Sequence, residues 1–153
     1  MKKVLIAVDD TTGSKGAFEA ACKICSAITP ETSILLYVEK LEGRSLIDEM
    51  LGVAEMSTLK EVLEGTEFKA ILDEKAKKIL NYYKKAIEDR GISGVETLIK
   101  GGHPADEILR TAAEEEVDMI VIGARGKRAS HLFMGSVSRE VANRADVPVL
   151  LVK

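Results

Sequence analysis

The chain has 153 residues, of which 46% are hydrophobic, 31% are charged and only three are proline. This composition is typical of a folded globular protein and excludes a disordered or fibrous chain. The formal net charge of −3 and the lack of a long apolar run argue against a general nucleic-acid binder and a membrane-spanning protein. We therefore expect one domain over residues 1–153, without a secretory signal and located in the cytoplasm.

Short apolar runs alternate with amphipathic stretches along the chain, a pattern that predicts a parallel β-sheet covered by helices on both faces. The first apolar run, Val4–Val8, is predicted to be a buried strand. A helix follows it and ends near Pro30, because proline cannot continue a helix. The second strand is expected at Ile34–Val38. The chain therefore opens with a strand, a helix and a second strand.

Two cysteines, Cys22 and Cys25, lie in this first helix with the spacing C-x-x-C. That spacing occurs in redox sites and in halves of metal sites. Here both thiols fall on the apolar stripe of the helix, and no second cysteine pair or histidine cluster completes a set of metal ligands. We therefore expect both cysteines to be core residues. The stripe comprises Ala17, Phe18, Ala21, Cys22, Cys25 and Ile28.

The region from Glu39 to Thr66 does not fit the alternation and is longer than a usual connection between a strand and a helix. Its glycines surround an amphipathic stretch, so we expect a partly helical insertion over residues 39–66. This insertion would serve as a lid, as a partner surface or as a helix packed on the domain. Its apolar residues are Leu46, Ile47, Met50, Leu51, Met56, Leu59 and Leu63.

The second half of the chain continues the alternation. A long helix is predicted from Phe68, with Gly91 at the position where it would end. A strand at Val95–Ile99 follows, and Pro104 suits the first turn of the next helix. The apolar face of that helix comprises Ile108, Leu109, Ala112 and Ala113, and the last elements are a strand at Met119–Ile122, a helix through Val137, Val141 and Ala145, and a strand at Val147–Val152.

Five parallel strands with right-handed crossovers form a doubly wound α/β fold, of which flavodoxin-like and Rossmann-like sheets are examples. We expect the strand order 3-2-1-4-5, in which the first and fourth strands are neighbours. Ligands of such sheets bind beyond the carboxyl ends of the strands, where the strand order reverses. Asp9 and Asp10 follow the first strand and Gly123 ends the fourth, so these residues are expected to line one crevice.

A glycine-containing segment from Gly123 to Ser138 follows the fourth strand. Glycines let backbone amides approach an anion, and the first amides of a helix beginning at Ser136 would point to the same anion. Lys127 and Arg128 add positive charge. The same residues also suit an ordinary tight turn and a helix cap. Spacing alone leaves both interpretations open, because neither the Walker A nor the dinucleotide glycine pattern is present.

The segment resembles the nucleotide-binding motif of the universal stress protein family, which is G-x-x-G, nine residues and then G-[ST]. This sequence has Gly123-Ala-Arg-Gly126, an eight-residue spacer from Lys127 to Met134, and then Gly135-Ser136. The segments "VLIAVDDTTGS", "ILLYVE", "GGHPADEIL", "VDMIVIGARG" and "ADVPVLLVK" are also similar to the family. The resemblance covers nearly the whole chain and implies a Rossmann-like fold of the adenine nucleotide alpha hydrolase-like type.

The resemblance implies that the chain binds ATP, or AMP or ADP, with Mg²⁺ or Mn²⁺ on the phosphates. It places the Asp9 carboxylate at the ribose and the Val38 backbone at the adenine, with Ala7 as a further contact to the base. No residue of the chain is expected to be catalytic or to ligate a metal directly. The remaining expected binding residues are Gly123, Arg125, Gly126, Lys127, Gly135, Ser136, Val137 and Ser138.

The function implied by the resemblance is that of a nucleotide-responsive regulatory or stress-response protein without efficient catalysis. Two alternatives stay open, a dimeric protein-interaction module that binds no nucleotide and a weak ATPase. A phospho-signalling receiver is disfavoured, because the third strand ends in "LIKGG" without an acceptor aspartate. Family members commonly pair through the last strand, so we expect a homodimer, with no nucleic-acid or membrane partner.

The two histidines have no acid or nucleophile at an informative distance in the sequence. His103 precedes Pro104 and is expected to be a helix-entry residue. His131 is expected to be an exposed loop residue, with a contact to phosphate as the alternative.

Overall fold

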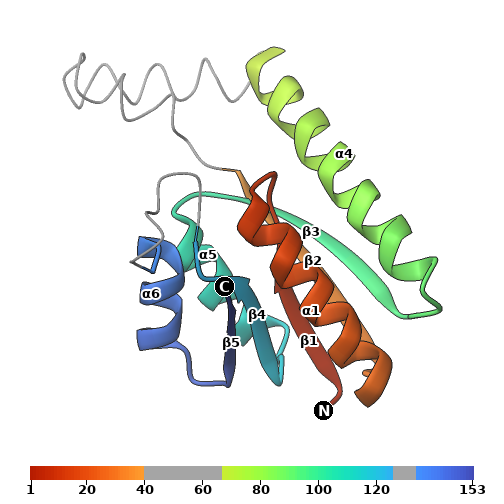
Figure 1. Cartoon of the computed structure of the whole chain (residues 1–153). Coiled ribbons are helices and arrows are strands. Elements are labelled where there is room, and N and C mark those ends of the chain that lie inside the picture. The colour runs from red at the N-terminus through yellow and green to blue at the C-terminus, as the bar shows by residue number, and fades with distance from the viewer. Residues whose placement is uncertain (40–66, 126–133) are drawn as a thin grey trace.

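A parallel sheet of five strands in the order β3-β2-β1-β4-β5 forms the centre of the computed structural model (Figure 1). The structure describes residues 1–39, 67–125 and 134–153. The strands are β1 (Lys3–Ala7), β2 (Thr32–Glu39), β3 (Val95–Gly101), β4 (Met119–Gly123) and β5 (Val149–Val152). The helices within the described ranges are α1 (Thr12–Ile28), α4 (Glu67–Glu88), α5 (Pro104–Glu114) and α6 (Ser136–Arg144).

The strand order predicted from the sequence is confirmed, and all four strand pairs are parallel. Strand β1 lies between β2 and β4, and its residues Val4, Leu5 and Ile6 have no solvent exposure. A strand covered on both faces needs apolar side chains at every position, which explains the unbroken apolar run. At the edge of the sheet, β5 begins two residues later than expected, after Pro148, whose carbonyl accepts a bond from β4.

Alternate residues of the strands form two apolar clusters on opposite faces of the sheet. On one face, α1 and α4 pack on a cluster that contains Val4 and Ile6. On the other face, α5 and α6 pack on a cluster that contains Leu5 and Ile120. In Figure 1, α1 crosses in front of the sheet and α5 lies behind it. The expected coverage of both faces by helices is confirmed.

Cys22 and Cys25 lie on the buried face of α1, with exposed fractions of 2% and 1%. The Ser33 hydroxyl of β2 donates to the Cys25 Sγ atom at 3.6 Å. Burial raises the pKa of both thiols, so neither cysteine is activated as a thiolate. The expectation that both cysteines are core residues is confirmed.

Helix α5 differs from its prediction on one face. The expected core residue Ala113 is exposed, whereas Thr111, which was not expected in the core, is fully buried. The buried stripe also includes Ala105 and Ile108, and this spacing turns Ala113 toward solvent. At the end of α4, Gly91 has a φ of +80°, the left-handed conformation expected of a residue that terminates a helix.

The insertion expected over residues 39–66 lies outside the described residues, apart from Glu39. Within the described ranges, none of the helices combines the length and the apolar character that crossing a bilayer requires.

Candidate functional site

Hydrogen bonds of Asp9 hold the loop that follows β1. The backbone amide and the hydroxyl of Thr11 both donate to Asp9 Oδ1, and the Asp9 amide donates to the Ser14 hydroxyl at 2.7 Å. Thr11 is the N-cap of α1, and its hydroxyl oxygen accepts a 3.2 Å bond from the Ser14 amide. Asp9 is therefore fixed and half-buried, and its Oδ2 accepts no hydrogen bond from the part of the chain that the structure describes.

The start of α1 contacts the end of β4, backbone against backbone. A Cβ atom on Gly13 would collide with the Arg125 carbonyl oxygen, and one on Gly123 would lie 2.6 Å from the Gly13 carbonyl oxygen. Side chains larger than glycine therefore do not fit at either position without a backbone shift. This contact joins the loops after β1 and β4 and brings Asp9 and Gly123 to the same edge of the sheet.

Helix α6 begins at this edge, with Gly135 as its N-cap. The Gly135 amide donates to the Ala124 carbonyl at 2.7 Å, and the buried Ser138 hydroxyl donates to the same carbonyl at 2.9 Å. The first intrahelical bond runs from the Arg139 amide to the Gly135 carbonyl at 3.1 Å. The amides of the three residues before Arg139 consequently have no acceptor within the helix. These residues are Ser136, Val137 and Ser138.

The start of α6 has the chemistry of an anion site. The amides that lack an acceptor within the helix and the positive end of the helix dipole both favour a negatively charged group. Ser138 can contribute only its amide, because its hydroxyl is engaged in the turn. Ser136 is exposed, and neither its amide nor its hydroxyl is engaged by another residue within the described ranges.

Ala7 and Val38 lie at the carboxyl ends of the neighbouring strands β1 and β2. Ala7 is in register with Leu36 of β2, and Val38 is in register with Lys100 of β3. Both side chains are half-buried and pack on the apolar cluster below α5 and α6. The structure therefore brings both residues to the edge of the sheet that also carries Asp9. Ala7 ends the strand that Asp9 follows, and Val38 lies on the neighbouring strand.

Glu39, which the sequence interpretation did not single out as a site residue, ends β2 with only 7% of its surface exposed. Burial, together with the neighbouring Asp73 carboxyl of α4, raises the pKa of Glu39 to about 7. Lys69 opposes this shift more weakly. Glu39 Oε1 is buried and has no hydrogen-bond partner within the described residues. The edge of the sheet therefore holds a carboxyl group that changes charge near neutral pH.

Helix α4 is tied to the loop after β1 by two contacts. The Tyr83 hydroxyl donates to the Asp9 carbonyl at 3.2 Å, and the Lys75 ammonium lies 3.3 Å from the Asp10 carboxylate. The sequence interpretation singled out neither Tyr83 nor Gly13 as a site residue. The one signal for Gly13 was the run of small residues "TTGS" directly after the two aspartates.

Two of the predicted binding residues, Gly126 and Lys127, lie outside the described residues, as does His131. Arg125 is described and half-buried, and its carbonyl contacts Gly13. The structure thus gathers the other predicted residues along one edge of the sheet. They are Ala7, Asp9, Val38, Gly123, Arg125, Gly135, Ser136, Val137 and Ser138.

This fold and this sequence match known proteins over nearly the whole of this chain. The sequence fits the profile of the universal stress protein family over residues 1–153. The chain belongs to this family. It is 33% identical over 156 residues to Universal stress protein MJ0577 of Methanocaldococcus jannaschii, which covers 99% of this chain and 94% of the relative. It is 30% identical over 152 residues to Universal stress protein YxiE of Bacillus subtilis, covering 99% of this chain and 98% of the relative.

Solved structures of universal stress proteins share the fold. Protein MJ0577 matches with a TM-score of 0.75 and 29% identity, over 99% of this chain and 95% of that chain. A family protein of Arabidopsis thaliana with AMP bound matches with a TM-score of 0.66 and 22% identity, over 100% and 92% of the two chains. A universal stress protein in complex with cAMP matches with a TM-score of 0.67 and 23% identity, over 99% and 97%. These matches confirm the doubly wound Rossmann-like fold.

Proposed function

We propose that this universal stress protein binds an adenine nucleotide, ATP or else AMP or ADP, at the carboxyl edge of the sheet between β1 and β4. One observation carries the proposal. The start of α6, with three amides that lack an intrahelical acceptor, lies at the same edge as the half-buried carboxylate of Asp9. A helix start suits phosphate, and a carboxylate oxygen suits the hydroxyl groups of a ribose.

The expected role of each residue follows from the hydrogen-bonding atoms that its contacts within the described residues leave available. Asp9 Oδ1 is occupied by Thr11, so Oδ2 would accept a hydrogen bond from the ribose. The amides of Ser136, Val137 and Ser138 would hold the phosphates, and Gly135 and Gly123 would line the site beside them without donating their amides. The Val38 backbone and Ala7 would meet the adenine. Arg125, Gly126 and Lys127 are assigned to the phosphate loop from the sequence motif alone, and Mg²⁺ or Mn²⁺ would sit on the phosphates.

The solved relatives support the choice of ligand class, because one of them carries AMP and another carries cAMP. We infer a regulatory, nucleotide-responsive role in the cytoplasm with at most slow hydrolysis. Phosphoryl transfer to water needs a group that positions the attacking water, and the sequence motif contains no obvious residue for this task.

A protein-interaction module that binds no nucleotide is the second candidate. The observation that favours it is the eight-residue spacer from Lys127 to Met134, one residue shorter than the nucleotide-binding motif. The two candidates make opposite predictions for ATP binding, so a single titration separates them.

The decisive experiment is a calorimetric titration of the full chain with ATP and Mg²⁺, comparing Ser136→Pro with Ser136→Ala. Proline is tolerated at the first helical position, and Gly135 already has the extended conformation (φ −61°, ψ 154°) that precedes proline. Both variants lose the hydroxyl, but only Ser136→Pro loses the amide. A lost hydrogen bond to a charged phosphate is worth about 1.5–3 kcal/mol, so we expect Ser136→Pro to bind about tenfold more weakly than Ser136→Ala or worse.

A second pair of variants tests the ribose contact. Asp9→Asn keeps an oxygen that can accept the bonds from Thr11 but replaces the other carboxylate oxygen by a donor, so we expect weaker binding. Asp89→Asn, at an exposed position just after α4, is the control and should bind as the wild type does. No heat of binding by the wild type at millimolar ATP would reject nucleotide binding, and equal affinities of the two Ser136 variants would reject the role of α6.

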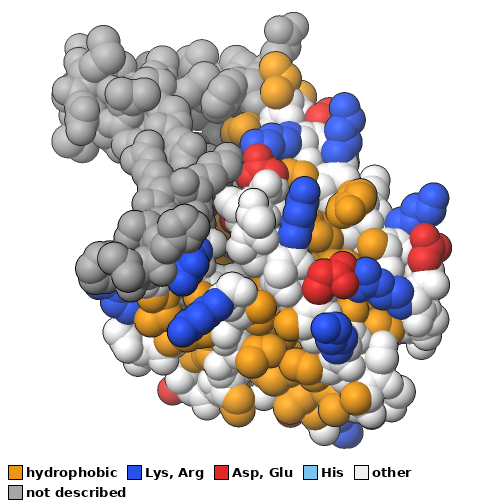
Figure 2. All heavy atoms as spheres, in the orientation of Figure 1, with side chains coloured by type: hydrophobic (Ala, Val, Ile, Leu, Met, Phe, Trp, Pro, Cys, Tyr) orange, Lys and Arg blue, Asp and Glu red, His pale blue; other side chains and the backbone are white. Residues whose placement is uncertain are grey.

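We also infer that two copies pair through β5. The strand lies at one end of the sheet, and its four residues are half-buried although they are all apolar. Figure 2 shows hydrophobic side chains gathered low on the visible face, beside β5, where Figure 1 places the lower parts of β4, β1 and α1. An apolar strand with an open edge is suited to association with a second copy.

A further inference from the structure

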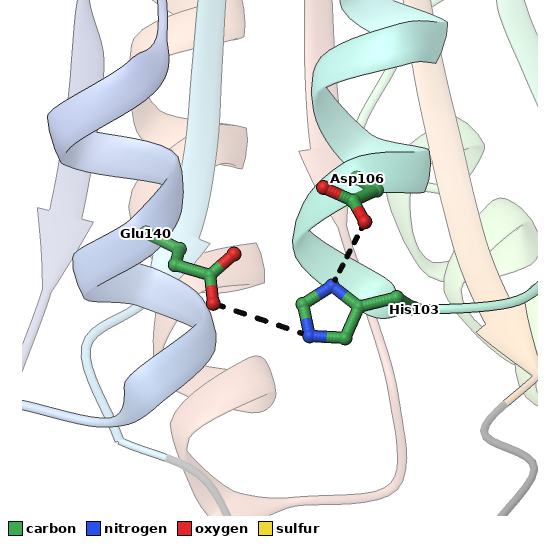
Figure 3. A group of neighbouring side chains, drawn as sticks. All are labelled: His103, Asp106 and Glu140. Atoms are coloured by element: carbon green, nitrogen blue, oxygen red, sulfur yellow. Dashed lines mark ion pairs between the residues drawn. The ribbon is translucent and has the colours of Figure 1, made fainter.

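Three polar side chains meet at the surface between α5 and α6 (Figure 3). His103 directly precedes α5, Asp106 lies in the first turn of α5, and Glu140 lies on α6. The His103 Nδ1 atom lies 3.5 Å from Asp106 Oδ2, and its Nε2 atom lies 4.0 Å from Glu140 Oε1. The sequence interpretation missed this group, because Glu140 is 37 residues away from His103 and only the packing of α6 on α5 brings them together.

The two carboxylates are oriented from behind by Arg144. Its Nη1 atom lies 2.7 Å from Asp106 Oδ1 and 3.2 Å from Glu140 Oε2. In each carboxylate one oxygen thus faces the guanidinium and the other faces the imidazole. Partners behind the ligands commonly fix their orientation in metal sites, and Arg144 has that position here.

The donor atoms are spaced closely enough to share one ion. One ligand atom from each of the three residues can be chosen so that all lie within 4.8 Å of one another. Ligands of a tetrahedral ion at bond lengths of about 2.0–2.2 Å lie roughly 3.3–3.6 Å apart. The side chains of His103 and Asp106 are 55% exposed and that of Glu140 is 43% exposed, so small rotations can close the difference.

We propose that His103, Asp106 and Glu140 form a surface site for one divalent transition-metal ion, such as Zn²⁺, that bridges α5 and α6. A neutral imidazole nitrogen and two carboxylate oxygens are a donor set that such ions accept, and water completes the coordination at an exposed site. The Arg144 charge lowers the affinity but does not occupy the oxygens that face His103. The site is independent of the proposed nucleotide, whose metal would be held by phosphate oxygens.

The competing arrangement is an ionic bridge without metal, in which a protonated His103 donates to both carboxylates. The two arrangements respond oppositely to pH, because a metal ligand must be deprotonated whereas the bridge needs the proton. The groups that face His103 from α5 and α6 are Asp106 and Glu140, with Arg144 behind them.

The test uses the full chain without nucleotide. Zn²⁺ is titrated calorimetrically into the wild type, His103→Gln, Glu140→Gln and His131→Gln, and Co²⁺ is added to the wild type while the imidazole C–H signals are followed by NMR. The chain has only two histidines, so two sets of imidazole signals are expected, and His131→Gln is the matched control.

We expect one Zn²⁺ per chain, binding that weakens as the pH is lowered, and roughly tenfold or greater loss of affinity in His103→Gln and Glu140→Gln. Co²⁺ should broaden or shift the His103 signal first. Three outcomes would overturn the proposal: no binding at millimolar Zn²⁺, equal affinity of His103→Gln and the wild type, or a Co²⁺ effect confined to His131. Circular dichroism of each variant checks that a lost affinity does not reflect a lost fold.

Discussion

Glu39 carries its carboxyl group at a position where ionisation is unfavourable. The group is buried at the end of β2, and the Asp73 carboxyl lies beside it, so its pKa rises from 4.5 to about 7. A folded-state pKa above the unfolded value means that the folded state binds the proton more tightly. The stability supplied by this proton is therefore fully present below about pH 4.5 and is lost as the pH rises through about 7.

We expect Glu39→Gln to stabilise the protein at pH 8, on the order of 1–3 kcal/mol, and to change stability little at pH 4.5. Glutamine stays neutral, keeps the shape of the side chain and can donate to Asp73. Urea unfolding of both proteins at the two pH values measures the difference. Glu74→Gln, at an exposed position of α4, is the control and should show no comparable gain at pH 8. An equal effect of Glu39→Gln at both pH values would contradict the assignment.

The two serines of the "GSVS" segment show which properties of a side chain the motif predicts and which it does not. The motif placed Ser136 and Ser138 at the start of a helix, and the structure confirms this position. It did not reveal that the Ser138 hydroxyl is buried and bonded to the Ala124 carbonyl, 14 residues earlier. That distinction depends on the path of the chain between the two residues, which the local sequence does not contain.

At the scale of elements, the packing of α1 against the end of β4 depends on two glycines. Gly13 and Gly123 let the two backbones approach more closely than a Cβ atom would permit. The sequence interpretation assigned Gly123 to anion binding. The structure gives it a packing role that would be needed whether or not a ligand binds.

We expect Gly13→Ala to destabilise the protein by about 1–3 kcal/mol, because its methyl group would collide with the Arg125 carbonyl oxygen. Gly16→Ala, one turn later in α1, is the matched control. Among the described residues its new methyl group would meet only Val152 Cγ1, at 3.9 Å, and alanine suits a helix better than glycine, so this variant should gain about 0.5–1 kcal/mol. Urea unfolding measures both, and a loss of stability in Gly16→Ala equal to that in Gly13→Ala would show that the collision is not the cause.

At the scale of the whole molecule, one side of the β5 backbone has no strand partner among the residues that the structure describes. The Pro148 carbonyl accepts a bond from Ile120 of β4, and the Val152 carbonyl accepts one from Ala124, directly after β4, so the backbone groups of the alternate residues Val149 and Leu151 point away from β4. Together with the apolar side chains of the strand, these groups form an edge that a second copy can extend or cover.

We expect the wild type to sediment as a dimer at micromolar concentration and Leu151→Lys to shift it toward monomer. A lysine on an edge strand opposes pairing, because its charge would have to be buried in the interface. Sedimentation velocity measures the mass, and circular dichroism checks the fold of the variant. Thr97→Lys, on the opposite edge strand β3, is the control and should remain dimeric. A wild type that stays monomeric across this range would exclude pairing through β5.

The sequence by itself determined the elements and the class of fold. Residues such as Val4, Leu5 and Ile6 form an unbroken apolar run because β1 is covered on both faces, and the apolar stripe of α1 places both cysteines inside. These patterns are local, because each depends on the period of a strand or a helix and on which face is buried. The glycine motif could also be recognised locally, and it predicted the edge at which Asp9 and α6 meet.

Only the tertiary structure decided which distant groups touch. The contact of Gly13 with Arg125, the pairing of Glu39 with Asp73, and the meeting of His103 with Glu140 all join residues at least 34 positions apart. No periodicity records such contacts, because they depend on how the helices cross the sheet and on the side chain that each helix turns toward its neighbour. The raised pKa of Glu39 has the same origin, since burial and a nearby carboxyl are properties of the packed chain.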